Sequence, residues 1–85
     1  MWYLYLIECT NGALYAGITT DVDARYAKHA SGKGAKYTRA NPPQRLIGSI
    51  EFADRSSAAK AEYKIKQLPR AAKVAFLRGD QKIEL

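Results

Sequence analysis

The Asn11-Gly12 turn most constrains the fold, because it lies between two runs of strand-forming residues. Asparagine and glycine tolerate the positive φ angles that hairpin turns need. Residues 2–8 before the turn and residues 14–19 after it are rich in aromatic and β-branched side chains, which favour strands. The sequence therefore predicts an antiparallel hairpin at the start of the chain.

Capping residues and breakers divide the remaining sequence into further elements. Asp21 and Asp54 are good N-caps, and Gly32 and Gly79 are suitable helix stops. The predicted helices span residues 22–30, 55–67 and 69–78, and a third strand spans residues 46–53. The order β-β-α-β-α-α predicts an α+β fold, in which helices pack on a small three-stranded antiparallel sheet.

Length and composition limit the kind of protein this is. A chain of 85 residues, 47% hydrophobic and 26% charged, predicts one globular domain over 1–79 and a loose tail over 80–85. Cys9 is the only cysteine, which excludes an intramolecular disulfide or a cysteine zinc site. The apolar segment 1–7 is too short for a signal peptide or a membrane span. We therefore expect a cytoplasmic protein with no membrane partner.

The charge is basic and unevenly placed. Fourteen Lys and Arg residues against 8 Asp and Glu residues give a net charge of +6. No acid falls between Asp23 and Glu51 or between Glu62 and Asp80, although both stretches carry several cations. Clustered cations gain affinity for a polyanion by releasing phosphate counterions, so the pattern favours a nucleic-acid partner. The alternative is a basic surface that only aids solubility.

The hairpin also carries candidate site residues. Gly17 lies two residues after Tyr15, hence on the same face of its strand, and a glycine there suggests close approach by a group such as a phosphate. Tyr5 shares that face only if the hairpin loop has an odd number of residues, such as 11–13, and we predict this loop. Both tyrosines are otherwise ordinary strand aromatics.

Arg25 and His29 share one stripe of the first predicted helix, together with Val22 and Tyr26. Arginine is a permanently charged fork suited to a phosphate, and His29 is suited to binding phosphate, orienting Tyr15 or moving a proton. A surface arginine and a solvent-exposed histidine are the simpler readings.

Glu62 lies within the apolar stripe of the second predicted helix, so its carboxylate should point toward the sheet and need a partner. One carboxylate together with substrate phosphate and water is typical of Mg²⁺. The alternative is an i,i+4 ion pair with Lys66.

The stretch 32–38 lacks the spacing and the Lys-Ser/Thr pair of a P-loop. We predict a basic loop in which Lys33, Lys36 and Arg39 contact backbone phosphates and Tyr37 stacks on a base or enters the site. A flexible surface loop is the alternative.

Taken together, these residues resemble the GIY-YIG nuclease superfamily over residues 2–78. Tyr3-Leu4-Tyr5 and Tyr15-Ala16-Gly17 occupy the places of its two motifs, followed by Arg25, His29 and Glu62. The stretch 32–39 is similar to that of short stand-alone bacterial members (YhbQ-like), which are in turn similar to the nuclease domain of Slx-type endonucleases.

The resemblance implies an endonuclease that uses Mg²⁺ or Mn²⁺, acts in repair or recombination, and takes DNA in preference to RNA as its substrate. Tyr15 would take part in activating the attacking water, Arg25 would stabilise the phosphate, and Glu62 would bind the metal. Tyr5, His29 and Tyr37 would orient substrate and water. No separate DNA-binding domain is evident, which implies weak target selection or a protein partner that supplies it. The alternatives are a non-catalytic nucleic-acid-binding module with the same fold and a small protein-interaction domain.

Overall fold

The computed structural model describes residues 1–79 and confirms the predicted α+β architecture with one additional short helix. In chain order, the elements are β1 (Trp2–Cys9), β2 (Leu14–Thr19), α1 (Val22–Ala30), α2 (Lys36–Ala40), β3 (Pro43–Phe52), α3 (Arg55–Ile65) and α4 (Arg70–Leu77). The tail expected over 80–85 lies outside the described residues. Within the described part, no helix has the length and apolar character needed to cross a bilayer.

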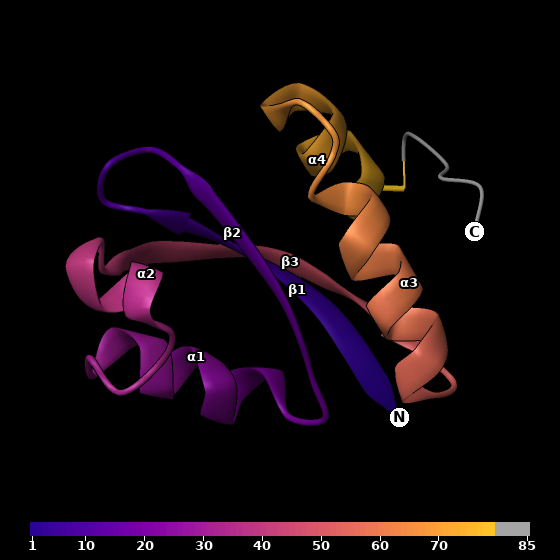
Figure 1. Ribbon diagram of the computed structural model, residues 1–85, viewed down its shortest axis with the longest axis horizontal. Coiled ribbons are helices and arrows are strands. Elements are labelled where there is room, and N and C mark those ends of the chain that lie inside the picture. The colour runs from indigo at the N-terminus through magenta and orange to yellow at the C-terminus, as the bar shows by residue number, and fades with distance from the viewer. Residues whose placement is uncertain (80–85) are drawn as a thin grey trace.

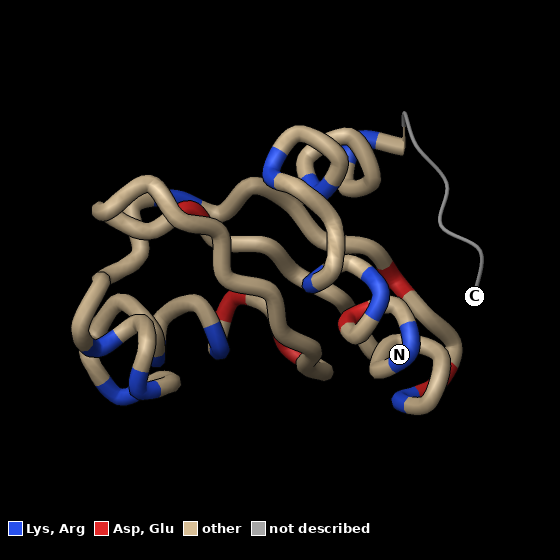
Figure 2. The backbone as a smooth tube through the Cα atoms, turned by 45° about the horizontal axis from the view of Figure 1, so that its top comes forward, with Lys and Arg blue, Asp and Glu red and all other residues tan. Residues whose placement is uncertain are grey.

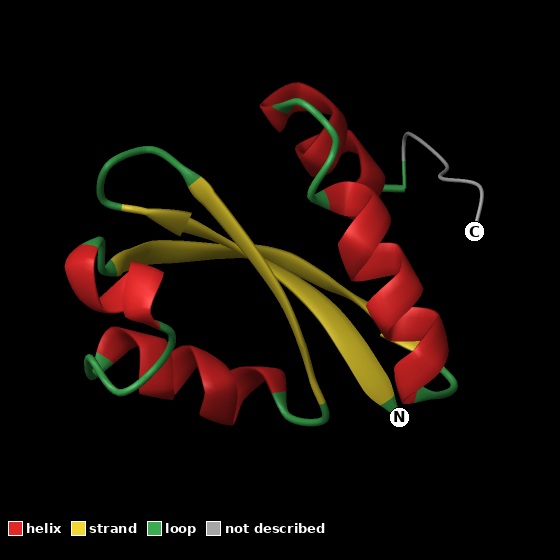
Figure 3. Ribbon diagram, viewed as in Figure 1, coloured by secondary structure: helices red, strands yellow, loops and turns green. Residues whose placement is uncertain are grey.

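The sheet is antiparallel, with strand order β2-β1-β3, so β1 is central and β2 is an edge strand. The three twisted strands cross the middle of the molecule (Figure 3). Helices α1 and α2 lie on one side of the sheet, and α3 and α4 lie on the other (Figure 1). Residues that alternate along β1 and β2 therefore face two different helical layers.

The hairpin loop has an odd number of residues, as predicted, although it begins one residue earlier. The Cys9 N–H donates to the Ala13 carbonyl and the Gly12 N–H donates to the Cys9 carbonyl, each over 2.9 Å. Gly12 has a φ of +85°. These features define a three-residue loop, 10–12, in which glycine adopts the left-handed conformation. Tyr5 consequently pairs with Gly17, and Tyr15 lies on the same face.

The two faces of the sheet bury different side chains. Under α3 and α4, the buried cluster is Leu4, Leu6, Ala16, Ala61 and Ile65. Ala58, Ala61 and Ile65 are fully buried, which confirms the apolar face predicted for this helix. Under α1, the buried cluster is Tyr5, Ile7 and Cys9, with Tyr15, Val22 and Tyr26 packed against it.

Helix boundaries follow the predicted caps. Asp21 accepts a hydrogen bond from the Ala24 N–H over 3.1 Å, and Asp54 accepts one from the Ser57 N–H over 2.8 Å. Pro69 is the N-cap of α4 rather than part of its first turn. Helix α3 ends at Ile65, two residues earlier than expected.

The third strand is longer than predicted and contains a bulge. It begins at Pro43, which pairs with Cys9, rather than at Leu46. The register shifts between Leu6 and Ile7, so that Gly48 pairs with Leu6 while Leu46 pairs with Ile7. This bulge leaves Ile47 without a partner in β1, and its side chain packs against the buried cluster under α3 and α4.

Glu8 connects the end of β1 to two distant segments. Its carboxylate accepts hydrogen bonds from Arg45 on β3, over 2.7 Å, and from Arg70 at the start of α4. Arg70 also donates to the Gly12 carbonyl in the hairpin loop. Hydrogen bonds from Arg45 and then Arg70 lower the pKa of Glu8. This carboxylate therefore holds the hairpin, β3 and α4 in register.

Candidate active site

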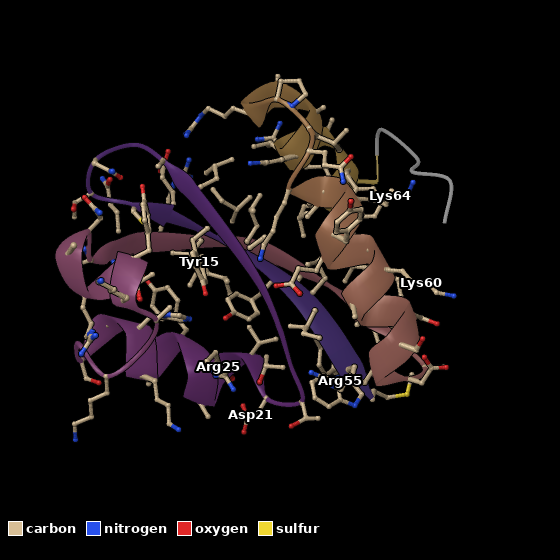
Figure 4. All side chains as sticks on the ribbon, in the orientation of Figure 1. Tyr15, Asp21, Arg25, Arg55, Lys60 and Lys64 are labelled. Atoms are coloured by element: carbon tan, nitrogen blue, oxygen red, sulfur yellow. The ribbon has the colours of Figure 1, made fainter. Side chains whose placement is uncertain are left out.

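A cleft of about 300 Å³ opens between β2, α1 and the segment that follows α1. We call it the α1 cleft, and its lining residues are Tyr15, Arg25, Lys28, His29, Lys33, Gly34 and Ala35. Tyr15 lies between β2 and α1, and Arg25 projects from α1 on the same side of the sheet (Figure 4). The fold therefore brings together residues from three segments that the sequence analysis had singled out separately.

A chain of buried hydrogen bonds supports this cleft from behind. The Tyr5 hydroxyl lies 3.0 Å from Nε2 of His29, and Nδ1 of His29 lies 2.7 Å from the Thr38 hydroxyl. The Thr38 hydroxyl in turn donates to the Ala35 carbonyl over 3.0 Å. All three side chains are buried. The chain therefore links β1, α1 and α2 through polar contacts from which water is excluded.

The direction of these bonds fixes the tautomer of His29. Thr38 has a single hydroxyl proton, and the Ala35 carbonyl can only accept a hydrogen bond. All three bonds form at once only if Nδ1 of His29 carries the proton and donates it to Thr38. Nε2 then accepts from the Tyr5 hydroxyl. His29 is thus held by both ring nitrogens, which suits it to orienting Tyr5 and Tyr15 rather than to moving a proton.

Burial keeps the hydrogen-bonded side chains of Tyr5 and His29 uncharged. It raises the pKa of Tyr5 to about 12, with a smaller contribution from Tyr15 that the charge of Arg25 opposes. Burial also lowers the pKa of His29, and the nearby Arg25 charge lowers it further. At neutral pH both groups therefore remain neutral, as the hydrogen-bond directions require.

Two glycines leave space for the hydrogen-bonded side chains of Tyr5 and His29. A Cβ atom at position 34 would lie 2.9 Å from Cα of His29, and one at position 17 would lie 2.6 Å from Cζ of Tyr5. Both distances are too short for non-bonded carbon atoms. Gly17 is therefore explained by the Tyr5 ring that crosses it, not by the phosphate approach from which we had inferred its role. Its contact with substrate stays a prediction.

The hydroxyl group of Tyr15 lies at the α1 cleft. The Tyr15 ring meets the edge of His29, with centroids 5.2 Å apart, and stacks against Tyr37 at 6.3 Å with a 12° interplanar angle. Within residues 1–79, the Tyr15 hydroxyl forms no hydrogen bond. The neighbouring series of hydrogen bonds passes through Tyr5, His29 and Thr38 and does not include it. The phenol is therefore held by its ring while its oxygen remains available to a ligand.

The cleft is also positively charged. Arg25, Lys28 and Lys33 line it, and the ion pairs found in the described part of the chain involve none of them. Among the described residues, no carboxylate contributes to its lining. Lys and Arg residues gather along α1 and α2 and again along α3 and α4 (Figure 2). Such a pocket is complementary to a phosphate.

The remaining predicted contact residues lie on α2, where we had expected a loop. Lys36, Tyr37 and Arg39 are exposed on this helix. Tyr37 accepts a hydrogen bond from the Asn11 side chain over 3.0 Å, so it bridges the hairpin loop and α2. A helix of one turn carries too little periodicity to be recognised in a sequence. Here it is stabilised by burial of Thr38 and by the stacking of Tyr37 on Tyr15.

Glu62 lies on α3, in the layer opposite the α1 cleft, and is not part of the cleft lining. Its side chain is 24% exposed and forms an ion pair with Lys66 over 3.1 Å. This is the pairing that we had considered as the alternative to metal binding. The negative charge of Glu62 nevertheless contributes to raising the pKa of Tyr5. The charge of Glu62 therefore acts on Tyr5 although the two residues belong to different layers.

The protein donors within residues 1–79 can be compared with the ligands that different metals require. Within residues 1–79, no three His, Cys, Asp or Glu side chains converge as a metal site. That donor set does not suit zinc, which takes three or four protein ligands. It fits Mg²⁺, which keeps several waters and is often held by one or two carboxylates together with substrate phosphates. Partly exposed Glu62 meets this requirement once Lys66 turns aside.

Sequence reasoning missed Thr38, Gly34 and Lys28. Thr38 and Gly34 could have been found only by knowing that α2 folds back on α1, which no local pattern indicated. Lys28 precedes His29 and follows Arg25 by three residues, so helical spacing alone places it near this stripe.

Comparisons with known proteins show the family to which the chain belongs. Residues 1–75 match the family model described as the GIY-YIG catalytic domain. A UPF0213 protein of Cupriavidus pinatubonensis is 55% identical over 75 residues, which cover 88% of this chain and 83% of that protein.

Two solution NMR structures have a similar fold. A UPF0213 protein from Bacillus halodurans has a TM-score of 0.55 and 47% identity, over 92% of this chain and 84% of that one. A protein from E. faecalis has a TM-score of 0.62 and 40% identity, over 91% of this chain and 82% of that one. The resemblance noted from the motifs is thereby confirmed. The chain belongs to the GIY-YIG family and carries its nuclease domain.

Proposed function

We propose that this chain is an endonuclease that hydrolyses phosphodiester bonds of DNA with the help of a divalent metal, and that it acts in DNA repair or recombination. The observation that carries the proposal is the α1 cleft, which Tyr15 lines together with three cations that form no ion pair within residues 1–79. A phosphate would be held there by charge, next to an oxygen able to position and activate water. A cytoplasmic location is part of this proposal.

Each side chain has a distinct task in this mechanism. Tyr15 positions the attacking water through its hydroxyl, or accepts a proton from that water after losing its own proton to solvent with the help of a nearby cation. Arg25 neutralises the charge that develops on the phosphate, and Lys28 and Lys33 hold the neighbouring backbone. The hydrogen bond from Tyr5 holds the His29 ring in place, and Tyr15 packs against that ring. Lys36, Arg39 and Tyr37 extend the contact along α2.

Glu62 would hold the divalent cation, Mg²⁺ or Mn²⁺. When bound, this cation would polarise the phosphate and support the leaving oxygen. Lys66 would release the carboxylate and itself become free to contact a phosphate. Because β2 is an edge strand, a substrate can reach both layers of the protein around this strand.

A specific observation also favours a second candidate. Glu62 is paired with Lys66 and lies outside the cleft lining, as expected of a non-catalytic nucleic-acid-binding module that retains the fold. In either case, target selection by so small a basic surface would be weak, and we propose that a protein partner supplies it. RNA is the less favoured substrate.

Cleavage of supercoiled plasmid and of a branched duplex in Mg²⁺ or Mn²⁺ separates the two candidates. We expect cleavage by the native chain and its loss in Glu62→Ala and Arg25→Ala. Lys66→Ala is the matched control, because it removes the other half of the ion pair and leaves the carboxylate free. Binding measured in EDTA tests whether each variant still folds and holds DNA. Salt-sensitive binding by a native chain that cleaves neither substrate would instead support the binding module.

A further inference from the structure

A second hollow, of about 500 Å³, lies on the outer side of α3. We call it the α3 cleft, and its lining residues are Arg55, Ser56, Ala59, Lys60, Tyr63 and Lys64. Lys60 and Lys64 project from the side of α3 that faces away from the sheet (Figure 4). The α3 cleft is larger than the α1 cleft and shares no residue with it.

Tyr63 forms an exposed aromatic surface in this cleft. Its side chain is 68% exposed, more than any other large hydrophobic residue in the described part of the chain. It lies on the opposite face of α3 from the buried Ala58, Ala61 and Ile65, so it contributes nothing to the core. The small residues Ser56 and Ala59 lie beside it on the helix and leave its ring face open.

The cations around this ring are available to a ligand. Lys60 and Lys64 are four residues apart, or about 6 Å along the helix axis. Arg55 lies over the ring of Trp2, with its guanidinium carbon 5.6 Å from the centroid. Within residues 1–79, none of the three forms an ion pair with a carboxylate. Hydrogen bonds from Ser57 lower the pKa of Asp54 and the charge of Lys60 lowers it slightly further, but the Asp54 carboxylate is engaged as the cap of α3.

We propose that the α3 cleft binds a single-stranded segment of nucleic acid. An unpaired base stacks on Tyr63, and the adjacent phosphates contact Lys60 and Lys64. An open aromatic ring flanked by cations matches single strands in particular, because their base faces are accessible, whereas a duplex covers them. An acidic protein segment would satisfy the cations but would leave the ring without a stacking partner.

This site rests on the proposed function for its connection to the α1 cleft, and it would deepen that function. Tyr63 follows Glu62 directly on α3, about 100° around the helix. A strand held by a phosphate near Glu62 can therefore continue over Tyr63. The substrate class that fits both sites is a DNA branch with a single-stranded arm, which emerges from the site of hydrolysis and is held on α3.

Binding in EDTA tests this site without requiring cleavage. The probes are a short single-stranded oligonucleotide that contains a fluorescent purine analogue and a blunt duplex of the same sequence. We expect Tyr63→Ala to weaken single-strand binding about 5- to 150-fold, as loss of one stacked base would, and to abolish quenching of the analogue. Tyr63→Phe should restore both, because it keeps the ring. Duplex binding should change little.

The salt dependence of binding tests the two lysines independently of Tyr63. The double variant Lys60→Ala/Lys64→Ala should lower the slope of log affinity against log salt by about 1.4 for the single strand. Arg78→Ala is the matched control, because it removes an exposed cation from α4 and should leave the single-strand affinity unchanged.

Three results would overturn the proposal. The first is unchanged single-strand affinity in Tyr63→Ala, and the second is an equal loss on duplex and single strand. The third concerns polyglutamate, used as a probe for an acidic protein segment. If Lys60→Ala/Lys64→Ala loses polyglutamate binding but keeps nucleic-acid binding, the cleft belongs to an acidic protein. None of these depends on catalysis, because each is a binding measurement made in EDTA, where no divalent metal supports hydrolysis. Absence of cleavage therefore refutes the proposed function while leaving this site standing.

Discussion

Replacing Gly17 by alanine should disrupt the buried hydrogen-bond chain, although the substitution adds only one methyl group. The new Cβ would lie 2.6 Å from Cζ of Tyr5 and closer still to its hydroxyl. The phenol is buried and bonded to His29, so it cannot swing away without losing that bond. The variant must therefore either push β2 away from β1 or expel the Tyr5 ring.

The magnitude follows from three contributions. Overpacking in a filled interior destabilises by about 1–3 kcal/mol. Loss of the Tyr5–His29 hydrogen bond adds about 1 kcal/mol. The reduced entropy of the unfolded chain returns about 0.4–1 kcal/mol, as for any glycine replaced by alanine in a compatible conformation. The expected net destabilisation is about 2 kcal/mol.

Gly48→Ala is the matched control. Gly48 lies on β3, where it pairs with Leu6 of β1. Among the described residues, a Cβ at this position would contact the Leu77 side chain alone, at 3.9 Å. This variant should be neutral or slightly stabilised, since 3.9 Å is an ordinary contact distance. Urea unfolding of both variants measures the difference, and the NMR signals of the His29 ring report whether Tyr5 has moved. Equal stability of the two variants with unchanged His29 signals would refute the packing argument.

Two further outcomes follow from the same hydrogen-bond chain. Thr38→Val keeps the shape of the side chain but leaves the His29 Nδ1–H unpaired, which should destabilise by about 1–3 kcal/mol in urea unfolding, whereas Thr38→Ser should retain most of the stability. Because burial lowers the pKa of His29, the unfolded chain takes up its proton first as the pH falls. The stabilisation from neutral His29 should thus be complete above about pH 6.5 and decline below it. The melting temperature of His29→Gln should fall less than that of the native chain over this range, and a parallel fall would contradict the assignment.

Local patterns predicted the elements whose causes are themselves local. Asp21 and Asp54 mark helix starts because their side chains accept backbone hydrogen bonds within three residues. The shared face of Tyr5 and Tyr15 followed from counting the loop, since a strand alternates with period two. These inferences needed no knowledge of the tertiary structure.

Features created by long-range contacts were not predictable in the same way. Helix α2 depends on Thr38 reaching His29, and the bulge at Ile47 depends on how β3 pairs with β1. The position of Glu62 is instructive, because its place in an apolar stripe correctly indicated partial burial but not which layer it would occupy. The reason for Gly17 was equally hidden, because Tyr5 crosses it from another strand.

The most direct test of the central claim is the single-turnover cleavage rate of Tyr15→Phe on a branched DNA duplex. This variant removes one oxygen atom and keeps the ring that stacks on His29 and Tyr37. If the α1 cleft is where water attacks the phosphate, the rate should fall about 100-fold or more while affinity for the same DNA in EDTA is unchanged. A native rate in Tyr15→Phe would show that hydrolysis does not depend on this hydroxyl and would contradict the proposed active site.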